Sequence, residues 1–121
     1  MKDKVTLNKK QIDLFFKEFK YWQNKLGLGH IEVYEVVEDT TNSFATINYH
    51  SHGISTLTLN PIFDTFAIKN IETSLRKTAK HEAMHLLLGE FSLMAGARCV
   101  TKDELDDAEE HLVRRLMGLI Q

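Results

Sequence analysis

Apolar residues recur at helical spacing near the start of the chain. Between about Asn8 and Leu26 they fall at steps of three and four, which places them on one face of a helix. Gly27 and Gly29 are expected to end that helix. The apolar face consists of Ile12, Phe15, Phe16, Phe19, Trp22 and Leu26.

The next part of the chain has the composition of β-strands. Ile31–Val37 is rich in β-branched and aromatic residues, and Phe44–His50 and Ile54–Asn60 are predicted as a second and a third strand. The segment 50–53, which ends in a glycine, has the length of a hairpin turn between the last two strands. Pro61 is expected to stop the third strand or to lie just beyond it.

Two helices are predicted in the last part of the chain. The first begins at about Asn70 or Ile71, with Asn70 as its N-cap, and ends near Phe91. The second begins at a capping box in residues 101–104 and continues to about Leu119. The order of helix, three strands and two helices predicts a single α+β domain over residues 1–121. Its helices are expected to pack on a small, mostly antiparallel three-stranded sheet.

Composition and charge exclude several classes of partner. The chain has 121 residues, of which 43% are hydrophobic and 26% charged, and its net charge is −2. This balance gives no electrostatic reason to expect nucleic acid or an anionic membrane as a partner. One cysteine, Cys99, cannot form an internal disulfide, and the first residues lack the apolar core of a signal peptide. We therefore expect a cytoplasmic protein that does not enter a membrane.

The most informative motif is the pentapeptide His81-Glu82-Ala83-Met84-His85. On a helix His81 and His85 lie one turn apart, so both imidazoles point to one side and can share a cation. Glu82 lies about 100° around the helix axis, close enough to reach a metal-bound water without binding the metal. Zinc accepts imidazole and carboxylate ligands and lowers the pKa of its water. The motif therefore predicts a Zn²⁺ site with Glu82 as the general base.

The third ligand is expected from the last helix. With Leu112 at zero and about 100° per residue, Glu109 falls near 60°, inside the apolar arc of that helix. Glu110 falls near 160°, outside the arc, by the same estimate. A carboxylate on a core-facing stripe is costly unless it is paired or bound to a metal, which makes Glu109 the predicted ligand. Glu110 is the main competitor, and a salt bridge is the alternative use of Glu109.

Four further residues are candidates for supporting roles. Asp106 falls near 120° on the same wheel and is suited to accept the spare N–H of a ligand histidine. His50 and His52 flank the predicted turn, and together with Tyr49 they could donate hydrogen bonds to a tetrahedral oxyanion. Solvated turn histidines are the simpler interpretation of His50 and His52.

Three segments in this order resemble a known family. They are Tyr21–Leu28, His81–Glu90 and Glu104–Leu116, and together they look like the small metallopeptidases encoded by bacteriophages and prophages. The resemblance extends from about residue 12 to residue 116. It implies a minimal zincin of the glutamate-ligand type, related in layout to the SprT-like and minigluzincin proteins.

The resemblance also implies roles for individual residues. His81 and His85 would be metal ligands, Glu82 the catalytic base and Glu109 the downstream carboxylate. The chain departs from larger gluzincins at Ala108 and Val113, where those proteins carry Asn and Asp. The contacts around the metal ligands that Asn and Asp supply in larger gluzincins are therefore missing or replaced in this chain.

Two functions follow from these observations as expectations. The first is a zinc-dependent peptidase that hydrolyses a peptide or protein substrate lying along a sheet edge. The second is a zinc-stabilised binding protein of phage or prophage origin without turnover, because about 120 residues leave little chain for a second lobe that would exclude water. The resemblance places either one in the cytoplasm of a bacterial host.

Overall fold

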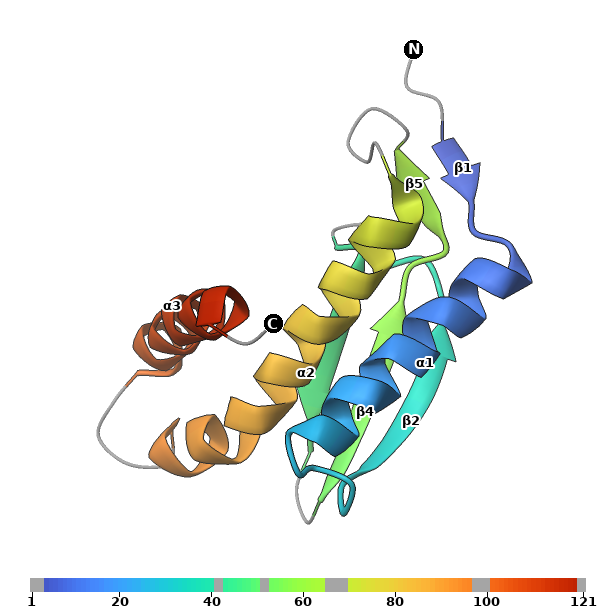
Figure 1. Cartoon of the computed structure of the whole chain (residues 1–121). Helices are drawn as coiled ribbons and strands as arrows, with labels where there is room; N and C mark the ends of the chain where they lie inside the picture. Colours follow the sequence, from blue (N-terminus) through green and yellow to red (C-terminus); the bar gives the residue numbers. More distant parts are fainter. Residues whose placement is uncertain (1–3, 41–42, 51–52, 65–69, 97–100, 120–121) are drawn as a thin grey trace.

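The computed structural model has three helices and two small sheets (Figure 1). It describes residues 4–40, 43–50, 53–64, 70–96 and 101–119. The elements in chain order are β1 (Lys4–Thr6), α1 (Lys9–Lys25), β2 (Glu32–Val37), β3 (Ala45–Tyr49), β4 (Ile54–Leu59), β5 (Ile62–Asp64), α2 (Ile71–Gly96) and α3 (Lys102–Leu119). This arrangement confirms the predicted α+β class.

Helix α1 begins and ends where its sequence predicts. The Asn8 side chain accepts a hydrogen bond from the Gln11 backbone, and the Gln11 side chain accepts one from the Asn8 backbone, which satisfies two N–H groups at the helix start. After the helix, Gly27 adopts a φ of 75°, a conformation that only glycine reaches at little cost. The predicted apolar face is inside: Phe15, Phe16, Phe19 and Trp22 are buried.

Asn70 caps α2 as predicted, whereas the capping box predicted for α3 forms only in part, since the Glu104 side chain accepts from the Thr101 hydroxyl rather than from its backbone. The Asn70 side chain accepts a hydrogen bond from the Thr73 backbone, and the Thr101 hydroxyl accepts one from the Glu104 backbone. Helix α3 has the predicted bounds. Helix α2 continues to Gly96, beyond the predicted end near Phe91. Among the described residues, no helix is long and apolar enough to cross a membrane.

The central sheet has the strand order β2-β4-β3. β3 and β4 form the predicted antiparallel hairpin, whereas β2 runs parallel to β4. The three-stranded sheet is thus half parallel, a difference from the mostly antiparallel expectation, because β4 inserts between the two strands that precede it. A second, antiparallel sheet pairs β1 with β5, two strands of three residues each that were not predicted.

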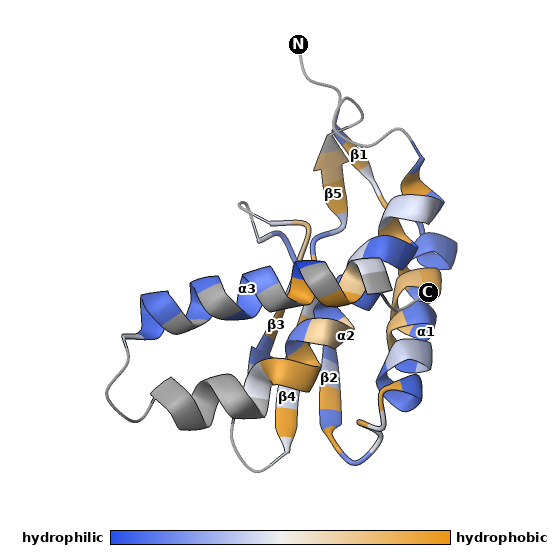
Figure 2. Cartoon of the chain, turned by 60° about the vertical axis from the view of Figure 1, so that its left-hand side comes forward, coloured by the Kyte–Doolittle hydropathy of each residue, from blue (hydrophilic) through white to orange (hydrophobic). Residues whose placement is uncertain are grey.

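The core lies between the helices and the central sheet. α1 and α2 lie side by side over one face of that sheet, and α3 packs against α2 (Figure 1). Figure 2 shows that hydrophobic residues recur along α1, α2 and β4. Leu57 and Leu59 of β4 and Leu75 of α2 are fully buried in this cluster. α2 therefore has one side in the core and another side that α3 covers.

Candidate metal centre

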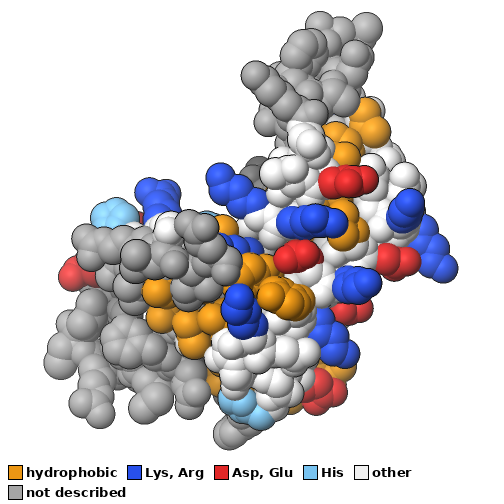
Figure 3. Space-filling view, viewed as in Figure 1, with side chains coloured by type: hydrophobic (Ala, Val, Ile, Leu, Met, Phe, Trp, Pro, Cys, Tyr) orange, Lys and Arg blue, Asp and Glu red, His pale blue; other side chains and the backbone are white. Residues whose placement is uncertain are grey.

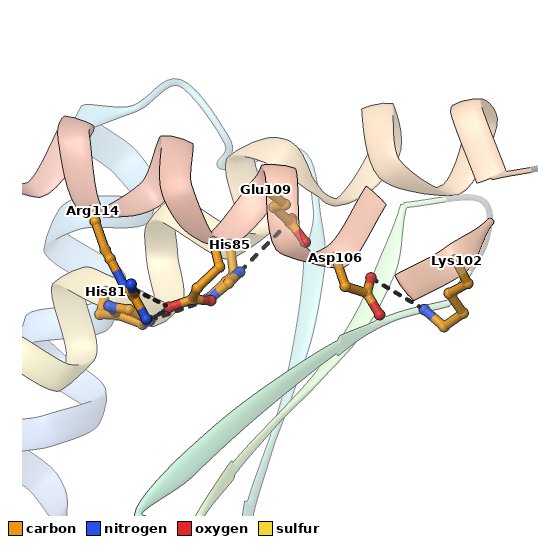
Figure 4. Close-up of polar contacts among 7 residues, drawn as sticks. His81, His85, Lys102, Asp106, Glu109 and Arg114 are labelled. Carbon is orange, nitrogen blue, oxygen red and sulfur yellow. Dashed lines mark hydrogen bonds and ion pairs between the residues drawn. The ribbon is translucent and has the colours of Figure 1, made fainter. Parts of the chain in front are cut away.

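The two histidines of the pentapeptide meet a carboxylate from α3. His81 and His85 lie one turn apart on α2, and their Nε2 atoms are 3.2 Å apart. Glu110 on α3 places Oε1 3.2 Å from His81 Nε2 and Oε2 2.9 Å from His85 Nε2 (Figure 4). All three side chains are partly buried, at the contact between α2 and α3. The two helices thus bring three potential ligands to one point.

The spacing of these atoms suits a metal ion. Tetrahedral zinc with bonds of about 2.0–2.1 Å separates its ligand atoms by about 3.3 Å. One atom from each of His81, His85 and Glu110 lies within 4.8 Å of the others. The two Nε2 atoms are 3.2 Å apart, and each of them lies 2.9–3.2 Å from a different oxygen of Glu110. Two imidazoles and a carboxylate are also a ligand set that catalytic zinc uses. These three side chains could therefore hold a metal ion, and their donor atoms are of the kinds that zinc accepts.

Glu109, the predicted third ligand, has a different place. Its Oε1 lies 3.7 Å from His85 Nδ1, the imidazole nitrogen that faces away from His81 (Figure 4). The side chain of Glu109 is 14% exposed, against 34% for Glu110, so the helical wheel ranks their burial correctly. Ligand histidines in metal sites usually give their second nitrogen to a carboxylate, which fixes the ring and its tautomer. The geometry favours Glu110 as the ligand and Glu109 as this orienting carboxylate.

Asp106 does not take the supporting role expected of it. Its carboxylate lies 3.5 Å from Lys102 Nζ, one turn earlier on α3, and both side chains are more than half exposed. Figure 4 shows Asp106 pointing toward Lys102 and away from the histidines. Glu109, about one turn further along α3, lies at His85 Nδ1 instead.

Glu82 is buried beside the imidazoles. Its side chain is 6% exposed, and Oε2 has no hydrogen-bond partner among the described residues. Burial raises the pKa of the Glu82 carboxyl to about 7; the charge on His85 opposes this shift, and Glu110 and Glu109 reinforce it. A buried carboxylate oxygen without a partner is costly and indicates a ligand, water or ion at that position.

The two imidazoles differ in their affinity for a proton. Burial and the neighbouring His85 lower the pKa of His81, against a smaller opposite effect of Glu110. Burial also lowers the pKa of His85, but its contacts with Glu109, Glu82 and Glu110 outweigh burial and leave that pKa raised. A proton on His85 can therefore balance the surrounding carboxylates in the metal-free chain.

The candidate oxyanion donors lie in three different situations. Tyr49 of β3 packs its ring against α2 at Gly89, one turn after His85, where a Cβ would lie 3.0 Å from Tyr49 Cβ. His50 is exposed, and its Nε2 lies 3.0 Å from the Thr56 hydroxyl. Because strand residues alternate between faces, His50 and Thr56 lie on the sheet face away from α2. His52 lies outside the described residues, as does Cys99.

Sequence reasoning missed a basic pocket beside His81. This pocket of about 640 Å³ lies between the three helices, and its basic lining residues are Arg76, Lys77, Lys80 and Arg114. The available signal is the spacing of the first three, which precede His81 on α2 within two helical turns. Comparisons of the chain with protein-family models, with curated proteins and with solved structures give no match.

Proposed function

We propose that the protein is a zinc-dependent peptidase in which His81, His85 and Glu110 bind the metal ion. The observation that carries this proposal is the meeting of the two imidazoles with a carboxylate of another helix, at ligand spacing, beside the buried Glu82. A carboxylate next to a metal site, with a pKa about 7, has the proton affinity of a general base at neutral pH. The proposed ligand set replaces Glu109 of the sequence-based prediction with Glu110.

Each residue has a distinct task in this proposal. When bound, the zinc ion would polarise the scissile carbonyl and lower the pKa of a water molecule. Glu82 accepts the proton of the attacking water and then delivers it to the departing amine. Glu109 keeps the His85 ring oriented through Nδ1. Tyr49 packs against the turn of α2 that follows His85. Of the predicted oxyanion donors that the structure describes, it is the one on the helix side of the sheet.

The sheet edge offers a place for an extended peptide. β3 is an edge strand of the central sheet and packs against α2, the helix that carries His81 and His85. Edge strands expose backbone N–H and C=O groups that pair with an added strand. A peptide or protein substrate is therefore proposed, in keeping with the resemblance to phage and prophage metallopeptidases.

A zinc-stabilised binding protein is the second candidate. Its supporting observation is that Glu110 contacts both imidazoles at once, which ties α3 to α2. A metal ion held by residues of two helices would stabilise their packing whether or not a reaction follows. The two candidates share the metal ion and differ in the task of Glu82, which only the peptidase requires.

The substitution Glu82→Gln separates the two candidates. The zinc-loaded variant is expected to retain its metal ion, because Glu82 is not a ligand, and to lose about 100-fold or more of casein hydrolysis. Release of peptides from unfolded casein and zinc per chain would be measured on the same samples. Glu35→Gln, a substitution of an exposed carboxylate on β2, is the matched control and should leave both quantities unchanged.

Two results would contradict the peptidase. Parental turnover by Glu82→Gln would remove the proposed base. A parent that holds one zinc ion per chain and releases no peptides from casein or from a peptide library would instead support the zinc-stabilised binding protein.

A further inference from the structure

The pocket beside His81 concentrates positive charge in a chain that is acidic overall. Its lining includes one acidic residue, Glu18, and four basic residues: Arg76, Lys77, Lys80 and Arg114. The whole chain, by contrast, has a net charge of −2. Trp22 supplies an apolar wall. Figure 3 shows basic side chains beside hydrophobic ones where the three helices meet. The lining therefore combines several cations with one aromatic surface.

Two of these cations are exposed and loosely held. Arg76 Nε lies 3.9 Å from Glu18 Oε1, and the Arg76 side chain is 59% exposed. Arg114 Nε lies 4.0 Å from Glu110 Oε1, and the Arg114 side chain is 70% exposed. Ion pairs this long, in which the guanidinium group is exposed, contribute little free energy. Both guanidinium groups can therefore turn to an incoming anion at little cost.

The aromatic wall is held in place from two sides. Trp22 is buried, and its Nε1 donates a hydrogen bond to Glu18 Oε2. Lys80 Nζ lies 4.8 Å from the centre of the Trp22 ring and donates a hydrogen bond to the Met117 carbonyl. The Trp22 ring thus has a fixed orientation at the pocket.

The pocket adjoins the metal centre. His81 belongs to both, because its ring lines the pocket and its Nε2 faces Glu110. Arg114 also lines the pocket, and its Nε lies 4.0 Å from Oε1 of Glu110, the same oxygen that His81 contacts. A peptide whose scissile bond lies at the metal centre would therefore place a neighbouring residue in the pocket.

We propose that this pocket is a specificity subsite that binds a carboxylate of the peptide substrate, next to the scissile bond. The inference rests on the proposed function. Guanidinium groups bind carboxylates through two parallel hydrogen bonds, and the lysines add positive charge. The carboxylate belongs either to an acidic side chain or to the C-terminus of the substrate. Glu18 lines the pocket and disfavours a polyanion such as nucleic acid.

Trp22 makes binding measurable without turnover. It is the one tryptophan of the chain, so with a Trp-free ligand any change in tryptophan fluorescence comes from this residue in the pocket. The protein used is the full chain with Glu82→Gln and zinc, which prevents cleavage. The probes are three hexapeptides of otherwise identical sequence: one with a central Glu and both ends blocked, one with Gln in its place, and one with Gln and a free C-terminal carboxylate.

The expected result is a charge-dependent preference. A peptide with a carboxylate binds about 10-fold more tightly than the blocked Gln peptide at low salt, and the preference falls to about twofold at 0.5 M NaCl. Adding Arg76→Gln or Lys77→Gln weakens binding of that peptide by about threefold to tenfold and leaves the blocked Gln peptide unaffected. Lys9→Gln, on the exposed first turn of α1, is the matched control and changes neither affinity.

The three peptides also identify the source of the carboxylate. Tighter binding of the Glu peptide supports an acidic side chain, and tighter binding of the free-acid peptide supports a terminal carboxylate. Equal affinity for all three peptides would overturn the inference, as would a preference that survives Arg76→Gln and Lys77→Gln together. Tighter binding of an oligothymidylate than of either acid would also overturn it.

Failure of the subsite and failure of the peptidase give different results. The cations do not require zinc, so the preference should persist with EDTA. If the parent hydrolyses casein but the preference is absent, the subsite is wrong and the peptidase stands. If the preference is present and the parent hydrolyses nothing, the pocket is a carboxylate site on a protein that is not a peptidase.

Discussion

Helix α2 has two sides of opposite character. On the side toward α1 and the central sheet, Leu75, Ala79, Ala83 and Leu86 are at most 1% exposed. On the side toward α3, the side chains of His81 and His85 are 33% and 20% exposed and contact carboxylates. The residues of the first side follow one another at steps of three and four, as a core-facing stripe requires. The residues of the second side are polar and lie on a different face of the same helix.

The two sides of α2 are stabilised by different interactions. The core side is stabilised by removing apolar surface from water, which requires only shape and volume. The side toward α3 gathers Glu82, Glu109 and Glu110 around two imidazoles, and a group of carboxylates this close is costly without a compensating cation. We therefore expect the core to determine whether the chain folds, and a metal ion to determine how tightly α3 is held.

The largest expected effect comes from breaking the core side. Phe15 of α1 is fully buried and stacks edge-on against Phe16, with their ring centres 5.3 Å apart. Phe15→Ala should lower the free energy of unfolding by about 3–5 kcal/mol, because it leaves a cavity. Urea denaturation measures this loss, and Tyr21→Ala, on the same helix but 54% exposed, should cost less than about 1 kcal/mol.

Zinc affinity provides the second half of this prediction. Under conditions where Phe15→Ala is still folded, its zinc affinity should equal that of the parent, since the substitution lies on the other side of α2. A parallel loss of zinc affinity would show that the two sides are not independent.

A smaller effect of opposite sign is expected from Glu82→Gln in the metal-free chain. The pKa of Glu82 is about 7 in the folded protein, against an ordinary value of 4.5. The folded state therefore binds this proton more tightly than the unfolded state, and the protein loses stability as the pH rises from 4.5 to 7. Gln resembles the protonated carboxyl, so the variant should be more stable than the parent at pH 8, by about 3 kcal/mol at most.

Denaturation in urea with EDTA at two pH values tests this sign. At pH 4.5 the difference between parent and variant should be near zero, and it should reach its full value above pH 7. A difference that is the same at both pH values would contradict the assigned cause. Glu35→Gln, on the exposed strand, is the control for the loss of one negative charge.

The smallest effect is expected at Asp106. Its ion pair with Lys102 is exposed, so Asp106→Asn should change the free energy of unfolding by less than about 0.5 kcal/mol and leave zinc affinity unchanged. Isothermal titration with zinc measures the second quantity. A tenfold loss of affinity would restore the role of Asp106 as the partner of a ligand histidine, as the sequence predicts.

The sequence predicts the bounds of the helices well because these depend on residues close together in the chain. The side chain of Asn8 reveals the start of α1 once the apolar face follows it, and the glycine at position 27 reveals its end. β1 and β5 escape prediction because three residues are too few to establish a period. The parallel pairing of β2 with β4 is also invisible locally, since it depends on which strand takes the centre of the sheet.

In the candidate site, too, the part that lies on one helix is predicted from the sequence, and the part that depends on the packing of two helices is not. The sequence places His81 and His85 together because both lie on one helix. The choice between Glu109 and Glu110 requires the crossing of α3 over α2, which no helical wheel contains. The wheel identifies the more buried residue, Glu109, but burial and contact with both imidazoles turn out to be properties of different residues.

Zinc binding to three proteins tests the metal centre most directly: the parent, Glu110→Gln and Glu109→Gln. The proposed ligand set predicts one zinc ion per parent chain and no stoichiometric zinc in Glu110→Gln. It predicts one zinc ion in Glu109→Gln, with affinity lower by about 10-fold to 100-fold, because the orienting carboxylate of His85 is lost. Zinc that is lost from Glu109→Gln and retained by Glu110→Gln would contradict the ligand set, and a parent that binds no zinc would contradict the metal centre itself.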